Sequence, residues 1–235
     1  MIVIRFIHTI LFHLLTVVSF FIGTTIALLF VPCNSDKTKP FKIAARLWAR
    51  TLAVFSGVKV TVTGLENIPK NQPLIIAANH QGAGDILILL ALLPVYFRFA
   101  IKKELFAIPV FGWYLKQAGY FPIDRSLVLS AYKMVEQITA ILKTGDSILI
   151  FPEGTRSPDG TLGKFKRGSL LAALKAGVPV LPVAISGSYQ LMPRGTWLIN
   201  PGPVKFSVGR PVTFTSEAEF DQQVEQVRQT IADLL

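Results

Sequence analysis

The chain has 235 residues, enough for one domain with a full hydrophobic core and an additional segment. Only 16% of the residues are charged and 51% are hydrophobic, whereas about 25% charged residues is usual, so a wholly water-exposed globular protein is a poor fit. The formal net charge of +10 favours anionic partners, and Cys33, the single cysteine, excludes an intrachain disulfide and a multi-cysteine zinc site.

The N-terminal segment reads as a helix long enough to reach across a bilayer. Thirty residues without a formal charge separate Arg5 from Asp36. At about 1.5 Å per residue, a helix of this length could reach about 45 Å. A cleaved signal peptide is the alternative, but its apolar core usually runs about 7–15 residues and ends at a small-residue site, which "FVPCNSDK" lacks. We therefore expect a retained membrane segment that either spans the bilayer or dips into one leaflet.

The next stretch, "KPFKIAARLWARTLAVFSG", predicts an amphipathic helix. Lys42, Arg46 and Arg50 follow one another at intervals of four and form one basic stripe. The pattern predicts a helix in the membrane interface, with the stripe on anionic headgroups and Trp48 as an anchor. An ordinary surface helix with a solvated charged face is the alternative.

The distribution of cations predicts the orientation of the chain. Lysine and arginine are far more frequent after the uncharged segment than before it, where Arg5 stands alone. The positive-inside rule then places the main domain on the cytoplasmic face of the membrane. We expect a membrane-associated two-helix segment at 1–57 and a separate domain at 58–235.

From residue 58 onward, short β-rich runs alternate with helical patterns, which predicts an α/β domain. The expected strands are 58–64, 73–79, 97–102, 147–154 and 179–188, and the expected helices are 84–93, 127–143 and 164–176, the last capped by Gly177. A final helix is marked by a Ser216–Glu219 capping box and by Phe220, Val224, Val227, Ile231 and Leu234 on one face.

The stretch "AANHQGAGDILILLALL", residues 77–93, places His80 and Asp85 five positions apart among apolar and small residues. In a continuous helix, residues with this spacing point about 140° apart. A strand-to-helix turn containing Gly82 and Gly84 would let the Asp85 carboxylate reach the imidazole. The carboxylate would then fix the tautomer and leave the other ring nitrogen free to take a proton. These residues alone leave open that Asp85 only caps the helix and His80 is an ordinary turn residue.

The stretch "FPEGTRSPDG", residues 151–160, follows an expected strand and contains a second set of polar groups. Loops after the carboxyl ends of strands are where α/β sheets bind ligands. Arg156 offers a planar fork for a phosphate, and Thr155 with the backbone N–H groups of the turn adds donors. A solvated loop with a surface ion pair is the alternative.

Further cations stand at the ends of two other apolar runs. Arg125 follows the run in "GYFPIDRS", and Lys102 and Lys103 end the run in "AIKKEL". All three are candidates for binding an anionic substrate, with ordinary exposed cations as the alternative. The sequence has no dinucleotide fingerprint, P-loop or serine-hydrolase elbow. It also lacks RNA-binding aromatic motifs and zinc-finger spacings, so we expect no nucleic-acid partner.

Taken in order, these stretches resemble the motifs of the 1-acylglycerol-3-phosphate acyltransferase family. The matching segments are "NHQGAGD" at 79–85, "GYFPIDR" at 119–125, "FPEGTRS" at 151–157 and "VPVLPVAI" at 178–185. The family patterns are N-H-x-x-x-x-D, G-x-x-F-I-D-R, F-P-E-G-T-R-S and V-P-V-x-P-V. The second segment departs from its pattern because Pro122 separates Phe121 from Ile123. The N-terminal segments are similar to the family's two-helix membrane motif.

The resemblance implies the family's fold, a mixed and largely parallel sheet flanked by helices, with an N-terminal membrane-binding segment. It implies acyl transfer from acyl-CoA or acyl-carrier protein to the free 2-hydroxyl of lysophosphatidic acid, which forms phosphatidic acid in phospholipid biosynthesis. His80 would be the general base and Asp85 would orient it. The implied substrate-binding positions are Lys102, Lys103, Arg125, Glu153, Gly154, Thr155 and Arg156.

Of these positions, Glu153 would hold either the glycerol hydroxyls or the turn itself, and the strand in 178–185 would line the acyl-binding side. No cofactor, metal ion or covalent acyl-enzyme is expected, and membrane phospholipids are the expected surroundings. Two alternatives remain: an acyltransferase of the same fold acting on another lysolipid, such as a lyso-ornithine lipid, and a non-catalytic lipid-binding membrane protein.

Overall fold

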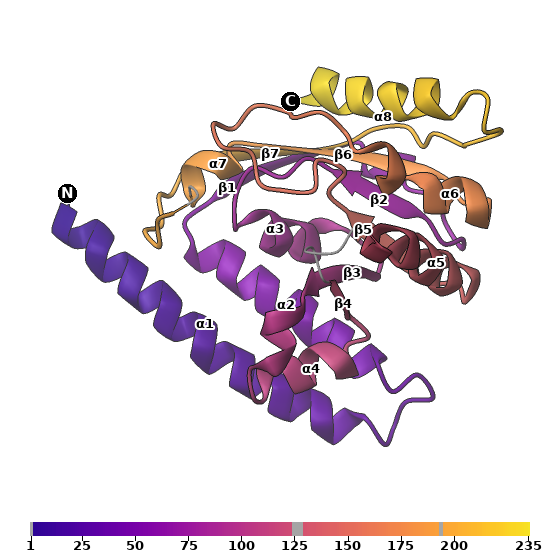
Figure 1. Cartoon of the computed structure of the whole chain (residues 1–235). Helices are drawn as coiled ribbons and strands as arrows, with labels where there is room; N and C mark the ends of the chain where they lie inside the picture. Colours follow the sequence, from indigo (N-terminus) through magenta and orange to yellow (C-terminus); the bar gives the residue numbers. More distant parts are fainter. Residues whose placement is uncertain (1, 124–128, 193–194) are drawn as a thin grey trace.

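The computed structural model describes residues 2–123, 129–192 and 195–235. Within them, seven strands form one sheet in the order β1-β7-β6-β2-β5-β3-β4 (Figure 1). The strands are β1 (Lys59–Thr63), β2 (Ile75–Ala78), β3 (Phe97–Lys102), β4 (Phe121–Ile123), β5 (Ser147–Ile150), β6 (Val180–Ser186) and β7 (Pro203–Val208).

The sheet is mixed and largely parallel, as expected. Strands β6, β2, β5, β3 and β4 pair in parallel, whereas β7 is antiparallel to β6 and parallel to β1. Parallel strands end at the same edge of a sheet. The loops after β2, β5 and β3, which carry the predicted site residues, therefore start from one edge.

Helices cover both faces of the sheet (Figure 1). They are α1 (Ile2–Phe30), α2 (Lys39–Phe55), α3 (Asp85–Leu92), α4 (Phe111–Gln117), α5 (Leu129–Lys143), α6 (Leu171–Ala176), α7 (Ser188–Leu191) and α8 (Phe220–Leu234), with 3₁₀ turns η1 (Leu65–Asn67), η2 (Lys103–Ala107) and η3 (Arg167–Ser169). Side chains of β2 alternate between the two faces. Ile76 joins a core cluster with Leu52 of α2, and Ile75 joins the opposite cluster with Val227 of α8.

Several boundaries differ from the sequence-based expectations. No strand was expected at β4 or β7. The helix expected at 164–176 begins only at Leu171 in α6, because the Lys166 N–H donates to Pro152 O at 2.9 Å and ties this stretch to the loop after β5. The predicted end at Gly177 is confirmed, since Gly177 caps α6 with φ 65°.

The capping box predicted for the last helix is wrong. The Ser216 hydroxyl accepts the Glu219 N–H at 3.4 Å, but the Glu219 carboxylate accepts from the Thr215 hydroxyl at 2.6 Å instead of the Ser216 backbone. α8 therefore begins at Phe220. Its predicted apolar face is confirmed, because Phe220, Val224, Val227 and Ile231 are buried and Leu234 packs partly buried against the same core.

Helix α1 is, within the described residues, the one helix long and apolar enough to cross a membrane. Most of its surface is exposed and carries large apolar side chains. Its hydroxyls donate to carbonyl oxygens one turn earlier, as Thr16 does to Phe12 O at 2.8 Å and Thr24 to Phe20 O at 2.7 Å. These groups need no water, so α1 suits apolar surroundings and indicates membrane association.

The basic stripe of α2 faces the α/β domain, so its predicted contact with headgroups is wrong. Lys42 is only 7% exposed, and its ammonium lies 3.1 Å from Asp146 Oδ1. Arg46 donates to Val95 O, just beyond the end of α3, at 2.8 Å. Arg50 donates to Ala91 O, in the last turn of α3, at 2.9 Å. Carbonyl oxygens near the C-terminus of a helix have no partner within the helix, so they attract cations. The two guanidinium groups bind these oxygens instead of lipid headgroups.

The outward face of α2 is apolar instead. Ile43, Leu47 and Val54 are exposed on it. Trp48, the predicted interfacial anchor, turns inward and donates from Nε1 to Thr16 O of α1 at 3.0 Å. The two helices therefore pack together through Trp48, and most of the side chains that they expose are apolar.

Candidate active site

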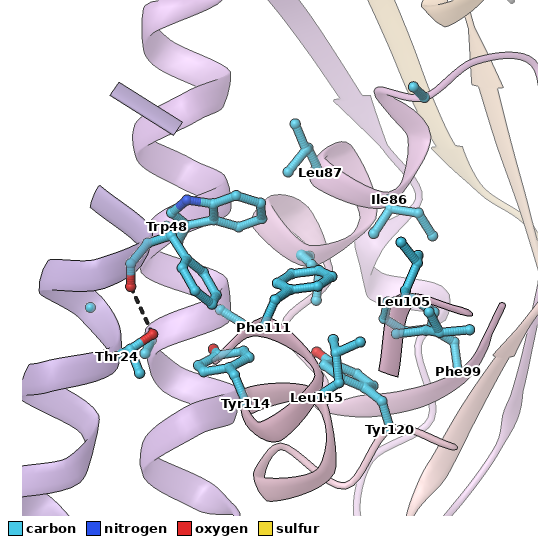
Figure 2. A pocket seen from close by; sticks show the side chains of 17 residues that line it. Thr24, Trp48, Ile86, Leu87, Phe99, Leu105, Phe111, Tyr114, Leu115 and Tyr120 are labelled. Atoms are coloured by element: carbon cyan, nitrogen blue, oxygen red, sulfur yellow. Dashed lines mark hydrogen bonds between the residues drawn. The ribbon is translucent and has the colours of Figure 1, made fainter. Parts of the chain in front are cut away.

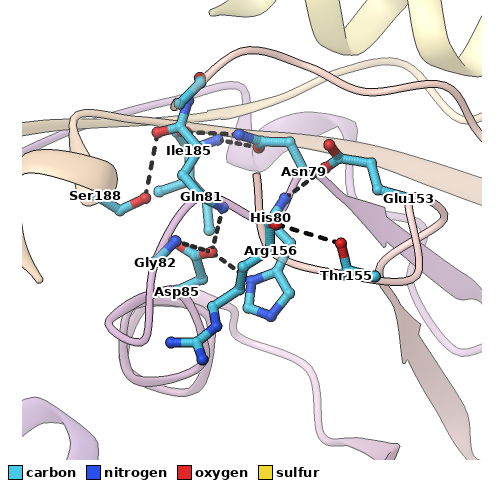
Figure 3. Close-up of polar contacts among 11 residues, drawn as sticks. Asn79, His80, Gln81, Gly82, Asp85, Glu153, Thr155, Arg156, Ile185 and Ser188 are labelled. Atoms are coloured by element: carbon cyan, nitrogen blue, oxygen red, sulfur yellow. Dashed lines mark hydrogen bonds and ion pairs between the residues drawn. The ribbon is translucent and has the colours of Figure 1, made fainter. Parts of the chain in front are cut away.

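The turn between β2 and α3 brings His80 and Asp85 together. The Asp85 Oδ2 atom lies 2.7 Å from His80 Nδ1 (Figure 3). A carboxylate can only accept here, so Nδ1 carries the hydrogen and donates it, and Nε2 is the ring nitrogen with a free lone pair. The contact expected from the spacing is present, in a turn and not along a helix face.

Asp85 is fixed by more than the histidine. It is fully buried as the first residue of α3, and its Oδ2 also accepts the N–H groups of Gln81 at 2.7 Å and Gly82 at 3.0 Å. Asn79, just before the histidine, exchanges two hydrogen bonds with Ile185 of β6, at 2.9 and 2.7 Å. The backbone on both sides of His80 is therefore held by the neighbouring strand and by the carboxylate.

The His80 ring lies flat on the ring of Phe151. The ring centroids are 3.9 Å apart and the planes differ by 13°. The side chain is still 17% exposed. Figure 3 shows the imidazole and the Arg156 guanidinium projecting to the same side, away from the sheet. An exposed ring edge beside a cation is suited to a small anionic substrate that carries a hydroxyl group.

Glu153 braces the turn. Its Oε1 accepts the His80 N–H at 2.8 Å and its Oε2 accepts the Gly163 N–H at 2.8 Å. The Ser157 N–H donates to His80 O at 2.7 Å, so the loops after β2 and β5 are joined at two points. Both Glu153 oxygens serve backbone groups, which matches the second of the two roles that the sequence left open for this residue.

The other predicted substrate-binding residues that the structure describes lie at the same edge. The Arg156 guanidinium has no hydrogen bond or ion pair with any of the described residues and is partly buried, and Thr155 is exposed beside it. Lys102 and Lys103 are exposed where β3 ends, and Lys102 lies 3.6 Å from Glu104. Arg125 lies outside the described residues.

The sequence motifs did not include Lys166, which approaches the same turn. Gly154 has φ +78°, and a Cβ built on it would lie 2.7 Å from the Lys166 ammonium nitrogen. Glycine therefore allows this cation to lie over the Glu153–Arg156 turn. The basic run in "KFKRG" could have indicated the residue, but only the fold brings it back to the turn.

The loop that follows Arg156 is held by its own hydrogen bonds. The Thr161 hydroxyl and backbone N–H donate to Asp159 at 2.7 and 3.0 Å, and Ser157 adds a third bond. These bonds, that of the Thr161 hydroxyl first, hold the pKa of Asp159 below its usual value. The carboxylate is thus occupied in shaping the loop.

An apolar cavity of about 330 Å³ lies between α1, α2, α3 and α4 (Figure 2). Its lining includes Phe20, Trp48, Ala83, Leu87, Phe111 and Tyr114. Ala83 belongs to the His80–Asp85 turn, so the cavity reaches the site. Burial raises the pKa of Tyr114 far above its usual value, and its phenol stays neutral and donates to Phe41 O at 2.7 Å.

Strand β6 does not line this cavity, so the role expected for 178–185 on the acyl-binding side is not found there. The strand pairs with β2 in the middle of the sheet, and its contribution to the site is the clamp on Asn79. In the described ranges, no cluster of three or more His, Cys, Asp or Glu side chains is placed to hold a metal ion.

Comparisons with known proteins agree with this geometry. Residues 59–186 match the family model described as Acyltransferase. A 1-acyl-sn-glycerol-3-phosphate acyltransferase of Pseudomonas aeruginosa is 34% identical over 239 residues, which cover 97% of the chain and 91% of that protein. The chloroplastic 1-acyl-sn-glycerol-3-phosphate acyltransferase LPAT1 of Arabidopsis thaliana is 36% identical over 198 residues, covering 83% of the chain.

The chain spans only 54% of the length of that chloroplast protein, and the same share of its Brassica napus counterpart. Among solved structures, the crystal structure of the 1-acyl-sn-glycerophosphate (LPA) acyltransferase PlsC from Thermotoga maritima superposes with a TM-score of 0.83 at 33% identity. The match covers 99% of this chain and 96% of that one.

Proposed function

Because the chain belongs to the 1-acyl-sn-glycerol-3-phosphate acyltransferase family, we propose that it transfers a fatty acyl group from an acyl thioester to the free 2-hydroxyl of 1-acylglycerol 3-phosphate, forming phosphatidic acid. The observation that carries the proposal is the His80–Asp85 pair, whose Nε2 is left free beside a cation and an apolar cavity.

The chemistry assigns His80 as general base. Its Nε2 accepts the proton of the 2-hydroxyl while the hydroxyl oxygen bonds to the thioester carbonyl carbon. The tetrahedral intermediate then collapses, the C–S bond breaks, and the thiolate takes the proton back from Nε2. Asp85 holds the ring and stabilises the imidazolium between the two steps, and Glu153 positions the His80 backbone.

The acceptor phosphate is bound by Arg156 with Thr155, at the turn after β5. Support comes from the guanidinium, which is partly buried and lacks a protein partner among the described residues. Lys166, whose ammonium lies over Gly154, adds a second cation, and Lys102 and Lys103 add a third source of charge at the end of β3. Arg125 completes the set proposed from the sequence.

The acyl chain of the donor thioester occupies the apolar cavity. The volume of about 330 Å³ lies at the lower end of typical ligand pockets, and Ala83 connects the lining to the catalytic turn. The cavity is formed partly by α1 and α2, so residues 1–57 both associate with the membrane and complete the acyl site. Residues 58–235 supply the catalytic groups.

We place the catalytic domain at the cytoplasmic face, where a water-soluble acyl-CoA or acyl-carrier protein would deliver the donor. The cluster of cations between residues 37 and 50, against Arg5 alone before α1, supports this orientation. Lys42, Arg46 and Arg50 bind the domain in the folded protein, but the topology rule counts residues during insertion and still includes them.

Removal of the base tests the proposal. His80→Ala is expected to lower turnover with lysophosphatidic acid at least ~10²-fold, because general base catalysis typically supplies about 10²–10⁴-fold. Membrane association should be unchanged. His13→Ala is the matched control, because it removes the same side chain at a position on α1 where the imidazole contacts Trp197 O and not Asp85. Retained activity in the His80 variant would overturn the assignment.

A second experiment separates possible acceptors. Arg156→Ala should raise the KM for lysophosphatidic acid and leave the KM for the acyl donor unchanged. An acceptor without phosphate, such as a lyso-ornithine lipid, should not depend on Arg156. An unchanged KM for lysophosphatidic acid would contradict the phosphate contact. Absence of thioester consumption with every lysolipid would instead favour a non-catalytic lipid-binding protein.

A further inference from the structure

The segment from η2 to the start of α4, residues 105–113, exposes large apolar side chains that the catalytic site does not use. Ile108 is 46% exposed, Val110 44% and Trp113 40%. Single exposed apolar residues are common, but clusters of them mark interaction surfaces. We call these three residues the 108–113 tip.

The tip is a rigidly built feature. Val110 has φ 61° and ψ −55°, and the Phe111 N–H donates to Pro109 O at 2.6 Å, which makes a γ-turn with positive φ at a β-branched residue. This conformation is rare and strained. Gly112 packs so closely that a Cβ built on it would lie 2.1 Å from Phe106 O. The backbone is thus locked in a shape that presents Ile108 and Val110 to the outside.

The same segment also contacts helices α1 and α2. Phe111 lies 5.5 Å from Phe20 of α1, ring centroid to ring centroid, and Trp113 lies 5.7 Å from Phe41 of α2. Leu105 and Phe111 line the apolar cavity. Figure 1 shows α4 beside α1 and α2. The segment therefore packs against two helices whose own exposed side chains are mostly apolar, and it contributes to the lining of the acyl cavity.

Cations flank the tip on both sides. Lys102 and Lys103 precede it and Lys116 follows it, and all three are exposed. Glu104, the acidic neighbour, lies 3.6 Å from the Lys102 ammonium. Apolar side chains between lysines are typical of segments that enter a leaflet, where lysines reach back to anionic headgroups.

We propose that residues 105–113 form a third membrane-inserted element, beside α1 and α2, which dips into the acyl layer of an anionic leaflet. Insertion places the mouth of the catalytic site at the depth of lipid chains, so lysolipid reaches His80 from the leaflet and not from water. This substrate route rests on the proposed function, whereas the insertion itself does not.

Depth-dependent quenching tests the insertion. The full-length Trp48→Phe/Trp197→Phe variant retains Trp113 as its sole tryptophan and is reconstituted into vesicles of phosphatidylglycerol and phosphatidylcholine. We expect a blue-shifted emission that is quenched by lipids brominated in the upper acyl chain. Vesicle-bound protein without quenching would overturn the proposal. A blue shift that depends on protein concentration and is not quenched would identify a second copy as the partner, which also overturns it.

A second variant avoids any dependence on the two tryptophan changes. Ile108→Cys in a Cys33→Ser background carries one exposed thiol for an environment-sensitive fluorophore. The probe should report an apolar environment on vesicle binding, and the same probe at Gln222→Cys on α8 should stay in water. An aqueous signal at position 108 in vesicle-bound protein would refute insertion.

Kinetics test the substrate route. Ile108→Asp should raise the KM for long-chain lysophosphatidic acid in vesicles roughly tenfold or more, because burial of one aliphatic side chain is worth at least about that factor. Activity on a short-chain, monomerically dissolved acceptor should be unchanged. Gln222→Asp introduces the same negative charge on α8 and should change neither the KM for long-chain lysophosphatidic acid nor the activity on the short-chain acceptor. If the wild-type chain has no acyltransferase activity, only this arm is lost, and the quenching result still decides insertion.

Discussion

The Asp85→Asn variant separates the charge of the dyad from its geometry. Asparagine has the same shape, and its side-chain oxygen can still accept from His80 Nδ1 and from the N–H groups of Gln81 and Gly82, as Asp85 Oδ2 does now. Only the negative charge opposite the imidazolium is lost. The expected result is a large fall in kcat with little change in the KM for either substrate.

The magnitude follows from the distance. With Nδ1 and Oδ2 2.7 Å apart, the charge centres of the ring and the carboxylate are separated by roughly 4 Å, and at an effective dielectric constant of about 20 they attract by about 4 kcal/mol. A loss of about 1.4 kcal/mol costs a factor of ten in rate, so the full charge is worth about 10³-fold. Since the neutral hydrogen bond remains, we expect kcat to fall about 10²- to 10³-fold.

A stability measurement must accompany the assay. The side-chain amide nitrogen that the Asp85→Asn change introduces would occupy the place of Asp85 Oδ1, a buried atom with no donor among the described residues. An unpaired buried amide costs about 1–3 kcal/mol, and each kcal/mol lowers the Tm of a chain of this size by about 2–4 °C.

Initial rates of Asp85→Asn and the wild-type protein are therefore compared well below the Tm, and His80→Gln is measured with them as the variant that lacks the base. If Asp85→Asn retained more than about a fifth of the wild-type kcat while folded, stabilisation of the imidazolium by the carboxylate charge would be refuted.

Two further predictions concern the helices that complete the site. Lys42→Met removes the ammonium from Asp146, which keeps Arg98 as a partner, so we expect the unfolding free energy to fall by about 1–3 kcal/mol. The measurement is the Tm in detergent, and an unchanged Tm would show that the Lys42–Asp146 pair contributes nothing to stability. Ala44→Phe places a ring in the cavity between α1 and α2, so donor competition assays should show a preference for acyl donors with shorter chains. An unaltered preference for donor chain length would mean that the acyl chain binds elsewhere.

The α/β domain could be predicted because its main elements carry strong local signals. The buried strands β2, β5 and β6 are short apolar runs, and α8 repeats apolar residues on one face. Strand β7 was missed although Val204, Phe206 and Val208 alternate with the polar residues Lys205 and Ser207 and the strand is followed by Gly209. Strand β4 has only three residues and one of them is Pro122, so no local pattern could distinguish it from a loop.

The site was predictable where its residues are close in sequence and not where the fold brings distant ones together. His80 and Asp85 lie in one turn, so their spacing was informative. Phe151 belongs to the motif at 151–157 and Lys166 to a basic run, but nothing local predicts that Phe151 stacks on His80 or that Lys166 lies over Gly154. The roles of all these residues remain predictions until the variants are measured.

The basic stripe of α2 shows how one pattern can serve two environments. Periodicity establishes that Lys42, Arg46 and Arg50 share a face, but not what covers it. In the fold, Arg50 reaches Ala91 O in the last turn of α3, and Asp85 is the first residue of the same helix. One short helix thus has the Asp85 carboxylate, which contacts His80, at its start and accepts a hydrogen bond from Arg50 of α2 at its end.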